Sequence, residues 1–139
     1  MEVEVQEVKK PPKQQLEKKW SPPRNTRLKC NTDGAWKQET EEGGMGWILR
    51  NHQGKMLWAG AKRAQGLNSE LEMEAEALRW AANTLAGFGY KNVTFETDSQ
   101  TLSRMLNGDE EIWPKVRPII QEIISSLASF EEVEVVYYL

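Results

Sequence analysis

Residues 27–59 read RLKCNTDGAWKQETEEGGMGWILRNHQGKMLWA, and the predicted architecture starts from this stretch. Three runs within it are typical of strands: Arg27–Thr32, Gly46–Arg50 and Lys55–Ala59. The residues Asn51–Gly54 favour a turn between the last two runs. We therefore predict an antiparallel meander of three strands.

Helical and strand-like patterns alternate after the meander. Ser69 can cap a long helix over Glu70–Ala86, and Gly87 and Gly89 follow its end. Further patterns predict a strand at Asn92–Glu96, a short helix from Ser99 to about Leu106, a second helix over Pro114–Ser129 and a final strand at Val133–Tyr138. This order predicts a mixed α/β fold in which an antiparallel hairpin leads into parallel crossovers.

The N-terminal part differs from the rest in charge and composition. Residues 1–29 carry eight Lys and Arg against four Glu, a net charge of +4, whereas the remainder carries ten against seventeen, a net charge of −7. Four prolines and few bulky apolar side chains lie between Gln6 and Arg27. Such a segment buries too little surface to offset its ordering entropy, so we predict a flexible Pro/Lys-rich linker over residues 1–27 and a folded domain over residues 28–139. An alternative is a nucleic-acid or nuclear-import patch formed by Lys9, Lys10, Lys13, Lys18 and Lys19.

The residue counts exclude several classes of protein. One Cys rules out an intrachain disulfide, and one His cannot complete a four-ligand Cys/His zinc site. A His-based hydrolase would depend on His52 alone, so hydrolytic chemistry is expected to rest on carboxylates and an oxygen-ligated metal. No apolar run reaches about 18 residues and the first residues lack a secretory pattern. We therefore expect an intracellular protein without a membrane span, in the nucleus or in the cytoplasm.

Glu74 stands at an unusual place in the long predicted helix. The apolar stripe of this helix consists of Leu71, Ala75, Leu78, Ala82 and Leu85. Glu74 lies three residues after Leu71 and four before Leu78, inside or at the edge of that stripe. A lone carboxylate there costs desolvation free energy unless a cation or hydrogen-bond donors compensate. The alternative is an edge glutamate whose carboxylate reaches solvent.

Two aspartates end predicted strands. Asp98 comes at the carboxyl end of its strand, the edge where open α/β proteins bind ligands, although it could instead cap the next helix together with Ser99. Asp33 follows the first strand, where Asp33-Gly34 could alternatively form a hairpin turn. If Asp33, Glu74 and Asp98 converge, a divalent cation must neutralise their repulsion, and oxygen ligands select Mg²⁺ or Mn²⁺. Two such ions can activate water and stabilise the leaving oxygen in phosphodiester hydrolysis.

Four short motifs, taken in order, resemble the ribonuclease H fold. They are CNTDGAW at 30–36, GGMGWILR at 43–50, EMEAEAL at 72–78 and FETDSQ at 95–100. The likeness is strongest to the reverse-transcriptase-like ribonuclease H domains of plants, many of them derived from retroelements, and it covers Trp20 to Leu139. The resemblance implies a five-stranded mixed sheet flanked by helices. It also implies bound Mg²⁺ (or Mn²⁺) and cleavage of the RNA strand of an RNA/DNA hybrid.

The resemblance assigns three catalytic residues, each of them a metal ligand. The first Asp of the family corresponds to Asp33, and its second Asp corresponds to Asp98. The Glu of the family corresponds to Glu74 rather than Glu76, because its Ala-Leu pair follows that Glu by three and four residues, as Ala77-Leu78 follows Glu74. The helical stripe selects Glu74 as well.

Residues beside these acids also match the family. Gly34, Ser99 and Gln100 occupy motif positions next to the acids, and the resemblance implies that they contact substrate. The fourth carboxylate of the family comes from a helix after the fifth strand, and this sequence ends at Leu139. We therefore expect a domain without its last helix.

Two functions follow from these observations. The first is a metal-dependent nuclease that acts on RNA/DNA hybrids or RNA. The second is a non-catalytic module on the same fold that binds nucleic acid or protein. The acidic body and the Glu70-Leu71-Glu72 approach to Glu74 favour the second, because added negative charge repels phosphates. The sequence names no protein partner.

Overall fold

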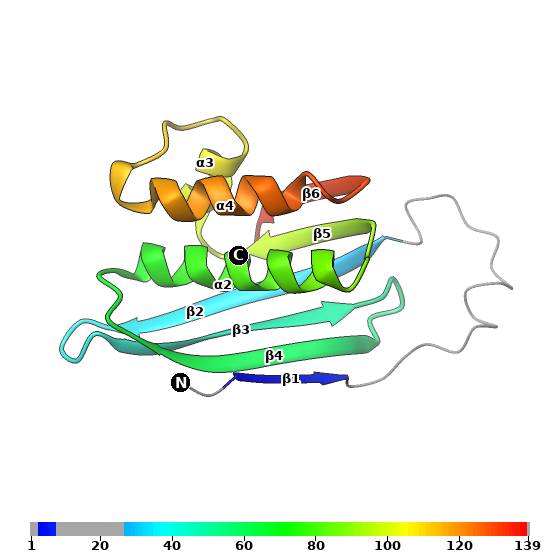
Figure 1. Ribbon diagram of the computed structural model, residues 1–139, viewed down its shortest axis with the longest axis horizontal. Helices are drawn as coiled ribbons and strands as arrows, with labels where there is room; N and C mark the ends of the chain where they lie inside the picture. The colour runs from blue at the N-terminus through cyan, green and yellow to red at the C-terminus, as the bar shows by residue number, and fades with distance from the viewer. Residues whose placement is uncertain (1–2, 8–26, 139) are drawn as a thin grey trace, which may run out of the picture.

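A computed structural model describes residues 3–7 and 27–138 of the chain (Figure 1). The elements are β1 (Val3–Glu7), β2 (Leu28–Lys37), β3 (Glu42–Arg50), β4 (Met56–Gln65), α2 (Glu70–Gly87), β5 (Asn92–Thr97), α3 (Gln100–Leu106), the 3₁₀ turn η2 (Pro114–Val116), α4 (Arg117–Leu127) and β6 (Glu132–Tyr137). Among these described helices, none combines the length and the apolar character that crossing a bilayer requires.

The strands form one mixed sheet in the order β1-β4-β3-β2-β5-β6. The β2, β3 and β4 strands pair antiparallel as a meander, and β5 and β6 run parallel to β2. The predicted α/β class, the meander and the parallel crossovers are therefore confirmed. The five predicted strands are β2 to β6, and β1 adds a sixth at one edge of the sheet.

The segment predicted as a linker, residues 1–27, contains a strand near its beginning. Val3–Glu7 forms β1, which pairs antiparallel with β4 from Val3 opposite Lys62 to Glu7 opposite Trp58. The free edge of β4 offers backbone hydrogen bonds that composition cannot reveal. Residues 8–26, with the prolines and the possible lysine patch, lie outside the described part of the chain.

The first predicted strand continues through the place where a hairpin turn was an alternative. Asp33 and Gly34 lie inside β2, which runs to Lys37. Gly34 is buried under α2, where an added Cβ would stand 2.8 Å from Cγ of Met73. The glycine thus allows close approach between helix and strand and does not make a turn.

The predicted helix over Pro114–Ser129 is interrupted near its start. Pro114–Val116 forms the 3₁₀ turn η2, and α4 covers only Arg117–Leu127. Pro118 stands in the first turn of α4, where the missing N–H of proline costs nothing. The second proline therefore marks the beginning of the α-helix.

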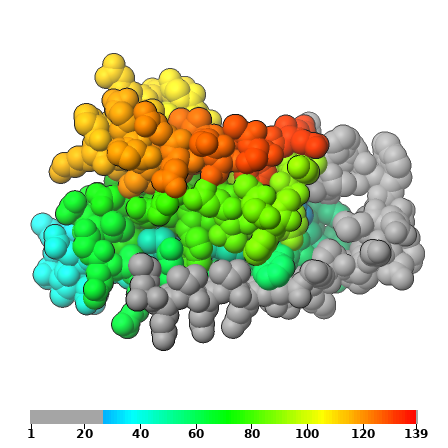
Figure 2. All heavy atoms as spheres, viewed as in Figure 1, coloured from blue at the N-terminus to red at the C-terminus, as the bar shows by residue number. Residues whose placement is uncertain are grey.

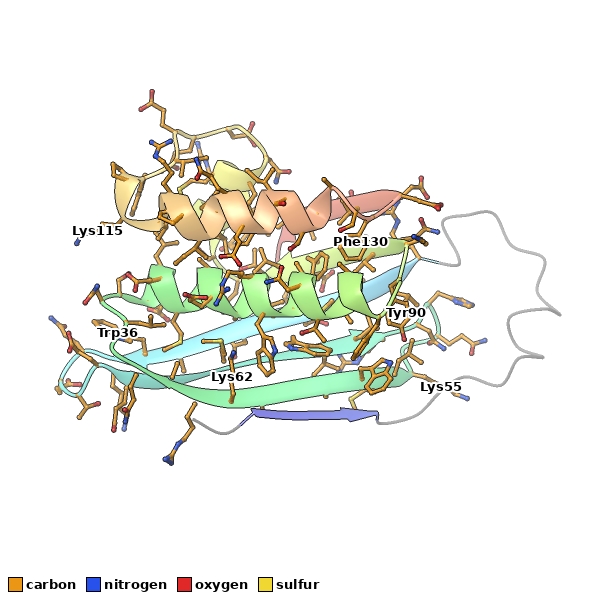
Figure 3. All side chains as sticks on the ribbon, viewed as in Figure 1. Trp36, Lys55, Lys62, Tyr90, Lys115 and Phe130 are labelled. Carbon is orange, nitrogen blue, oxygen red and sulfur yellow. The ribbon has the colours of Figure 1, made fainter. Side chains whose placement is uncertain are left out.

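The helices cover one face of the sheet. In Figure 1, α2 lies against the sheet and runs roughly along the direction of its strands, and Figure 2 shows α4 packed alongside it. The core between these helices and the sheet includes the strand residues Trp47, Phe95 and the predicted core residue Cys30, all at most 2 % exposed. Phe130, labelled in Figure 3, meets Phe95 edge to face at a ring-centroid distance of 5.8 Å. This helix-covered face supplies most of the apolar burial.

The opposite surface of the sheet, here called the open face, has a different composition. Side chains alternate along each strand, so the neighbours of core residues point to this face. It carries Asn31 and Asp33 of β2, Gly46 and Ile48 of β3, and Ala59 and Ala61 of β4. Within residues 3–7 and 27–138, no helix packs on it.

Candidate metal centre

Two aspartates lie where neighbouring parallel strands separate. The β2 and β5 strands pair from Leu28 opposite Val93 to Thr32 opposite Thr97. The next residue on each strand is an aspartate, Asp33 on β2 and Asp98 after β5. Both are exposed, and they follow adjacent strand positions. The sheet therefore holds the two carboxylates side by side at the edge where α/β proteins place ligands.

Glu74 reaches the same point from α2. Ser69 caps this helix by accepting a hydrogen bond from the Glu72 amide at 3.1 Å, which fixes where the helix begins. Glu74 follows in the first turns and is only 5 % exposed. One carboxylate oxygen from each of Asp33, Glu74 and Asp98 lies within 4.8 Å of the other two. The predicted convergence of the three acids is therefore seen in the structure.

The pKa of Glu74 reflects its burial and the charges of the other two acids. Burial, then contact with Asp98 and the charges of Asp98 and Asp33, raises the pKa of Glu74 from 4.5 to about 9, and the Gly34 amide opposes this rise. Its Oε1 is buried and has no hydrogen-bond partner among the described residues. A buried carboxylate oxygen without a donor, beside two further carboxylates, fits the oxygen-rich ligand set of Mg²⁺ or Mn²⁺.

The structure decides between the alternatives that the sequence leaves open. Glu74 is buried, so it is not an edge glutamate in solvent. Asp98 does not cap α3, because the Ser99 hydroxyl accepts the hydrogen bond from the Leu102 amide at 3.2 Å. Gln100 is the exposed first residue of that helix. Asp98 is thus available to the acidic cluster.

The single histidine lies apart from the acids. His52 is exposed in the turn between β3 and β4 and is not a member of the acidic group.

Sequence reasoning missed a polar network beside the acids on the open face. The amide of Asn31 donates to Oε1 of Glu96 at 2.7 Å, and Arg50 donates to Oδ1 of Asn31 at 3.2 Å. Nζ of Lys29 lies 3.3 Å from Oε2 of Glu96. Residues two apart on a strand share a face, so Asn31 could have been placed next to Asp33. Its partners could not, since they come from β3 and β5.

A groove on the open face adjoins the carboxylates. Its volume is about 440 Å³, and its walls include Asp33, Gly46, Ile48 and Ala61. The small residues Gly46, Ala59 and Ala61 of β3 and β4 make room there. Asp33 therefore belongs both to the acidic cluster and to the lining of this groove.

The comparison with family models gives the family. A model described as reverse transcriptase-like matches residues 31–139, which includes all three acids. The chain belongs to this family. A search of curated proteins found no match.

Solved structures similar to this family member share its fold. Ribonuclease H1 from the halophilic archaeon Halobacterium salinarum is 22 % identical with a TM-score of 0.75, covering 81 % of this chain and 85 % of that one. The N-terminal ribonuclease H domain of a Mycobacterium tuberculosis protein is 13 % identical with a TM-score of 0.72, covering 81 % and 83 %. LC11 ribonuclease H1, isolated from compost by a metagenomic approach and solved with an RNA/DNA hybrid, is 19 % identical with a TM-score of 0.72, covering 80 % and 84 %. The ribonuclease H-like fold is thus confirmed, while the likeness to plant domains stays a prediction.

Proposed function

We propose that the chain is a metal-dependent nuclease of the ribonuclease H type that cleaves the RNA strand of RNA/DNA hybrids. The observation that carries this proposal is the buried Glu74 carboxylate, which forms one acidic cluster with Asp33 and Asp98 and whose Oε1 has no hydrogen-bond partner among the described residues. Such a cluster is unfavourable without a cation. The fold, the family and the hybrid bound by LC11 ribonuclease H1 support the choice of substrate.

The three acids have different parts in this proposal. Asp33 and Asp98 are exposed and would hold Mg²⁺ or Mn²⁺ from the side that substrate approaches, whereas Glu74 would hold it from the buried side. When bound, two divalent cations supply activation of a water and stabilisation of the leaving oxygen. Gly34 keeps α2 close to β2 and so positions Glu74. Ser99 and Gln100 stand beside Asp98, where they can contact the substrate strand.

A non-catalytic module that binds nucleic acid or protein is the second candidate. The first turn of α2 is acidic, with Glu70 and Glu72 on the helix that carries Glu74. Negative charge there opposes a phosphate backbone unless cations compensate it. This module would keep the fold and need no metal.

The deciding experiment is cleavage of an end-labelled RNA/DNA hybrid by the full chain. We expect cleavage with Mg²⁺ or Mn²⁺ and none with EDTA. Asp33→Asn should lower the rate by about a hundredfold or more, because it removes a ligand charge from the site. Asp109→Asn, the same change at an exposed turn residue, is the matched control and should leave the rate unchanged.

The melting temperature measured with and without Mg²⁺ separates the two candidates and does not require cleavage. In the nuclease, Mg²⁺ relieves repulsion among the acids, so it should raise the melting temperature of the wild type and not that of Asp33→Asn. A stabilisation of about 2.7 kcal/mol is expected when the free ion is a hundred times its dissociation constant. A folded wild type that neither cleaves hybrid nor responds to Mg²⁺ or Mn²⁺ would establish the non-catalytic module.

A further inference from the structure

Two buried threonines precede the two aspartates of the metal centre. Thr32 comes directly before Asp33, and it is 5 % exposed. Thr97 has the same place before Asp98 and is 1 % exposed. The two threonines lie opposite one another and form the last residue pair that joins β2 to β5. A buried hydroxyl is unfavourable without a hydrogen bond, so the partners of each threonine show what it does.

The Thr97 hydroxyl closes the turn that carries Asp98. It accepts a hydrogen bond from the Ser99 amide at 3.1 Å, across the aspartate. Threonine hydroxyls form such bonds to the backbone two residues further on, and the bond fixes a tight turn. On the other side of the aspartate, the Ser99 hydroxyl is held by the Leu102 amide at 3.2 Å. Asp98 therefore stands in a turn that is bound at both ends.

Asp33 does not depend on its threonine in this way. It lies inside β2, where the backbone ladder pairs it with Gly46 and continues beyond it. The Thr32 hydroxyl donates to the Glu96 carbonyl oxygen at 3.4 Å, a long contact for a hydroxyl donor. The β5 strand, in contrast, ends immediately before Asp98. The ladder thus fixes one aspartate, and a side-chain hydrogen bond fixes the turn that holds the other.

The place of Asp98 matters because its neighbour in the cluster is held rigidly. Glu74 is buried in the helix layer, and its carboxyl group contacts that of Asp98. Mg²⁺ requires oxygen ligands in nearly ideal octahedral geometry, at about 2.0–2.1 Å. A carboxylate displaced by a fraction of an ångström therefore weakens binding of the ion.

We propose that Thr97 is a positioning residue of the metal centre, whose hydroxyl holds Asp98 at the separation from the other two acids that a divalent cation requires. This role takes Mg²⁺ or Mn²⁺ as the ligand and so rests on the proposed function. Thr32 has no such role, although it is also buried and also precedes an aspartate, because the ladder of β2 already fixes Asp33.

The principal experiment measures Mg²⁺ binding by the full chain, from the melting temperature as a function of ion concentration. Thr97→Val keeps the volume of the side chain and removes the hydroxyl, so we expect the dissociation constant to rise about five- to tenfold. Thr32→Val is the matched control, the same change on the facing strand position, and should bind Mg²⁺ within about twofold of the wild type. The Mg²⁺ concentration for half-maximal cleavage of hybrid should shift by the same factors.

A serine variant separates positioning from packing. Thr97→Ser loses a buried methyl group and keeps the hydroxyl, so it should lower the melting temperature in EDTA and bind Mg²⁺ like the wild type. A side chain that only filled the core would give the reverse order of valine and serine. Thr97→Ala differs from Thr97→Ser by the hydroxyl alone, so this pair repeats the comparison if Thr97→Val does not fold.

Hydrogen exchange of the Ser99 amide supplies a readout without metal or cleavage. In EDTA, Thr97→Val should speed exchange of this amide about tenfold, because the amide loses its acceptor. The Leu102 amide is bound to the Ser99 hydroxyl and should keep the rate of the wild type. Thr32→Val should change neither rate.

Three results would overturn the proposal. They are equal Mg²⁺ dissociation constants in Thr97→Val and Thr32→Val, weaker Mg²⁺ binding by Thr97→Ser than by Thr97→Val, and Ser99 amide exchange that Thr97→Val leaves unchanged. Failure of the proposed function gives a different pattern, because the wild type itself then shows no response to Mg²⁺ or Mn²⁺. That pattern removes both the nuclease and the positioning role, whereas a wild type that responds and a Thr97→Val protein that responds equally removes the positioning role alone.

Discussion

The two faces of the same sheet have side chains of opposite character. On the helix-covered face, Leu49 and Phe95 are completely buried. On the open face, the alternating residues include the exposed Asp33 and the polar Asn31 and Glu96. Adjacent residues thus differ in surroundings, as the buried Thr32 and the exposed Asp33 show.

The two faces therefore have different roles: the helix-covered face contributes stability, and the open face carries the polar and charged groups. The helix-covered face gains free energy from apolar burial and tolerates no empty space. The open face instead carries polar and charged groups, among them Asn31, Asp33 and Glu96. Glu74 joins the two, because it belongs to the buried helix layer and yet meets the exposed Asp33 and Asp98. Four predictions test this division, beginning with the largest effect.

Truncation of a core ring should have the largest effect on stability. Phe95→Ala removes a fully buried ring that packs against Phe130, so we expect a loss of about 3–5 kcal/mol in urea unfolding. Ile48→Ala on the open face removes a half-buried side chain and should cost only about 1 kcal/mol. Equal losses at the two positions would contradict the division between the faces.

Replacing glycine by alanine should cost more stability on the helix-covered face than on the open face. In Gly34→Ala the new Cβ would meet the Met73 backbone at 3.0 Å, and we expect a loss of about 1–3 kcal/mol with a weaker response to Mg²⁺. In Gly44→Ala the nearest atom is 3.5 Å away, an ordinary contact, so stability should change by less than about 0.5 kcal/mol. Thermal unfolding with and without Mg²⁺ measures both effects. A Gly34→Ala protein as stable and as responsive as Gly44→Ala would show that α2 does not need the glycine.

Because Glu74 is buried beside Asp33 and Asp98, the free energy of unfolding should depend on pH when no metal is bound. The raised pKa of Glu74 means that the folded chain keeps this group protonated between pH 4.5 and about 9, while the unfolded chain has it ionised. Stability therefore falls as pH rises through this window, because the unfolded chain releases the proton that the folded chain retains. Urea titrations in EDTA at several pH values measure the slope.

Two variants test whether Glu74 causes this dependence of stability on pH. Glu74→Gln cannot ionise, so it should flatten the dependence on pH. Glu70→Gln alters an exposed glutamate of the same helix and should leave the slope as in the wild type. An unchanged slope in Glu74→Gln would place the effect elsewhere in the chain.

The smallest effect is expected for an exposed ion pair on the open face. The Lys29 side chain is 55 % exposed and its Nζ lies 3.3 Å from Glu96. Lys29→Ala should therefore lower the free energy of unfolding by less than about 0.5 kcal/mol, and added salt should reduce the difference further. A loss comparable with that of Gly34→Ala would mean that the open face also carries the stability of the fold.

Much of the fold could be predicted because it depends on local patterns. The spacing of Leu71, Leu78 and Leu85 and the cap at Ser69 give α2 almost to the residue. The β1 strand could not be predicted, because its stability depends on the edge of β4, far along the chain. The extension of β2 past Asp33 was missed for a similar reason, since the role of Gly34 depends on Met73 in α2.

The sequence by itself predicted which three acids form the candidate site. Asp33 and Asp98 stand at positions that the strand pattern marks, and Glu74 breaks the apolar stripe of a helix, which a local pattern reveals. Only the tertiary structure decided that the three carboxylates meet and that one buried oxygen among them, Oε1 of Glu74, has no hydrogen-bond partner among the described residues. Desolvation and charge interactions arise between groups distant in sequence, so they exist only once the sheet and α2 are packed together.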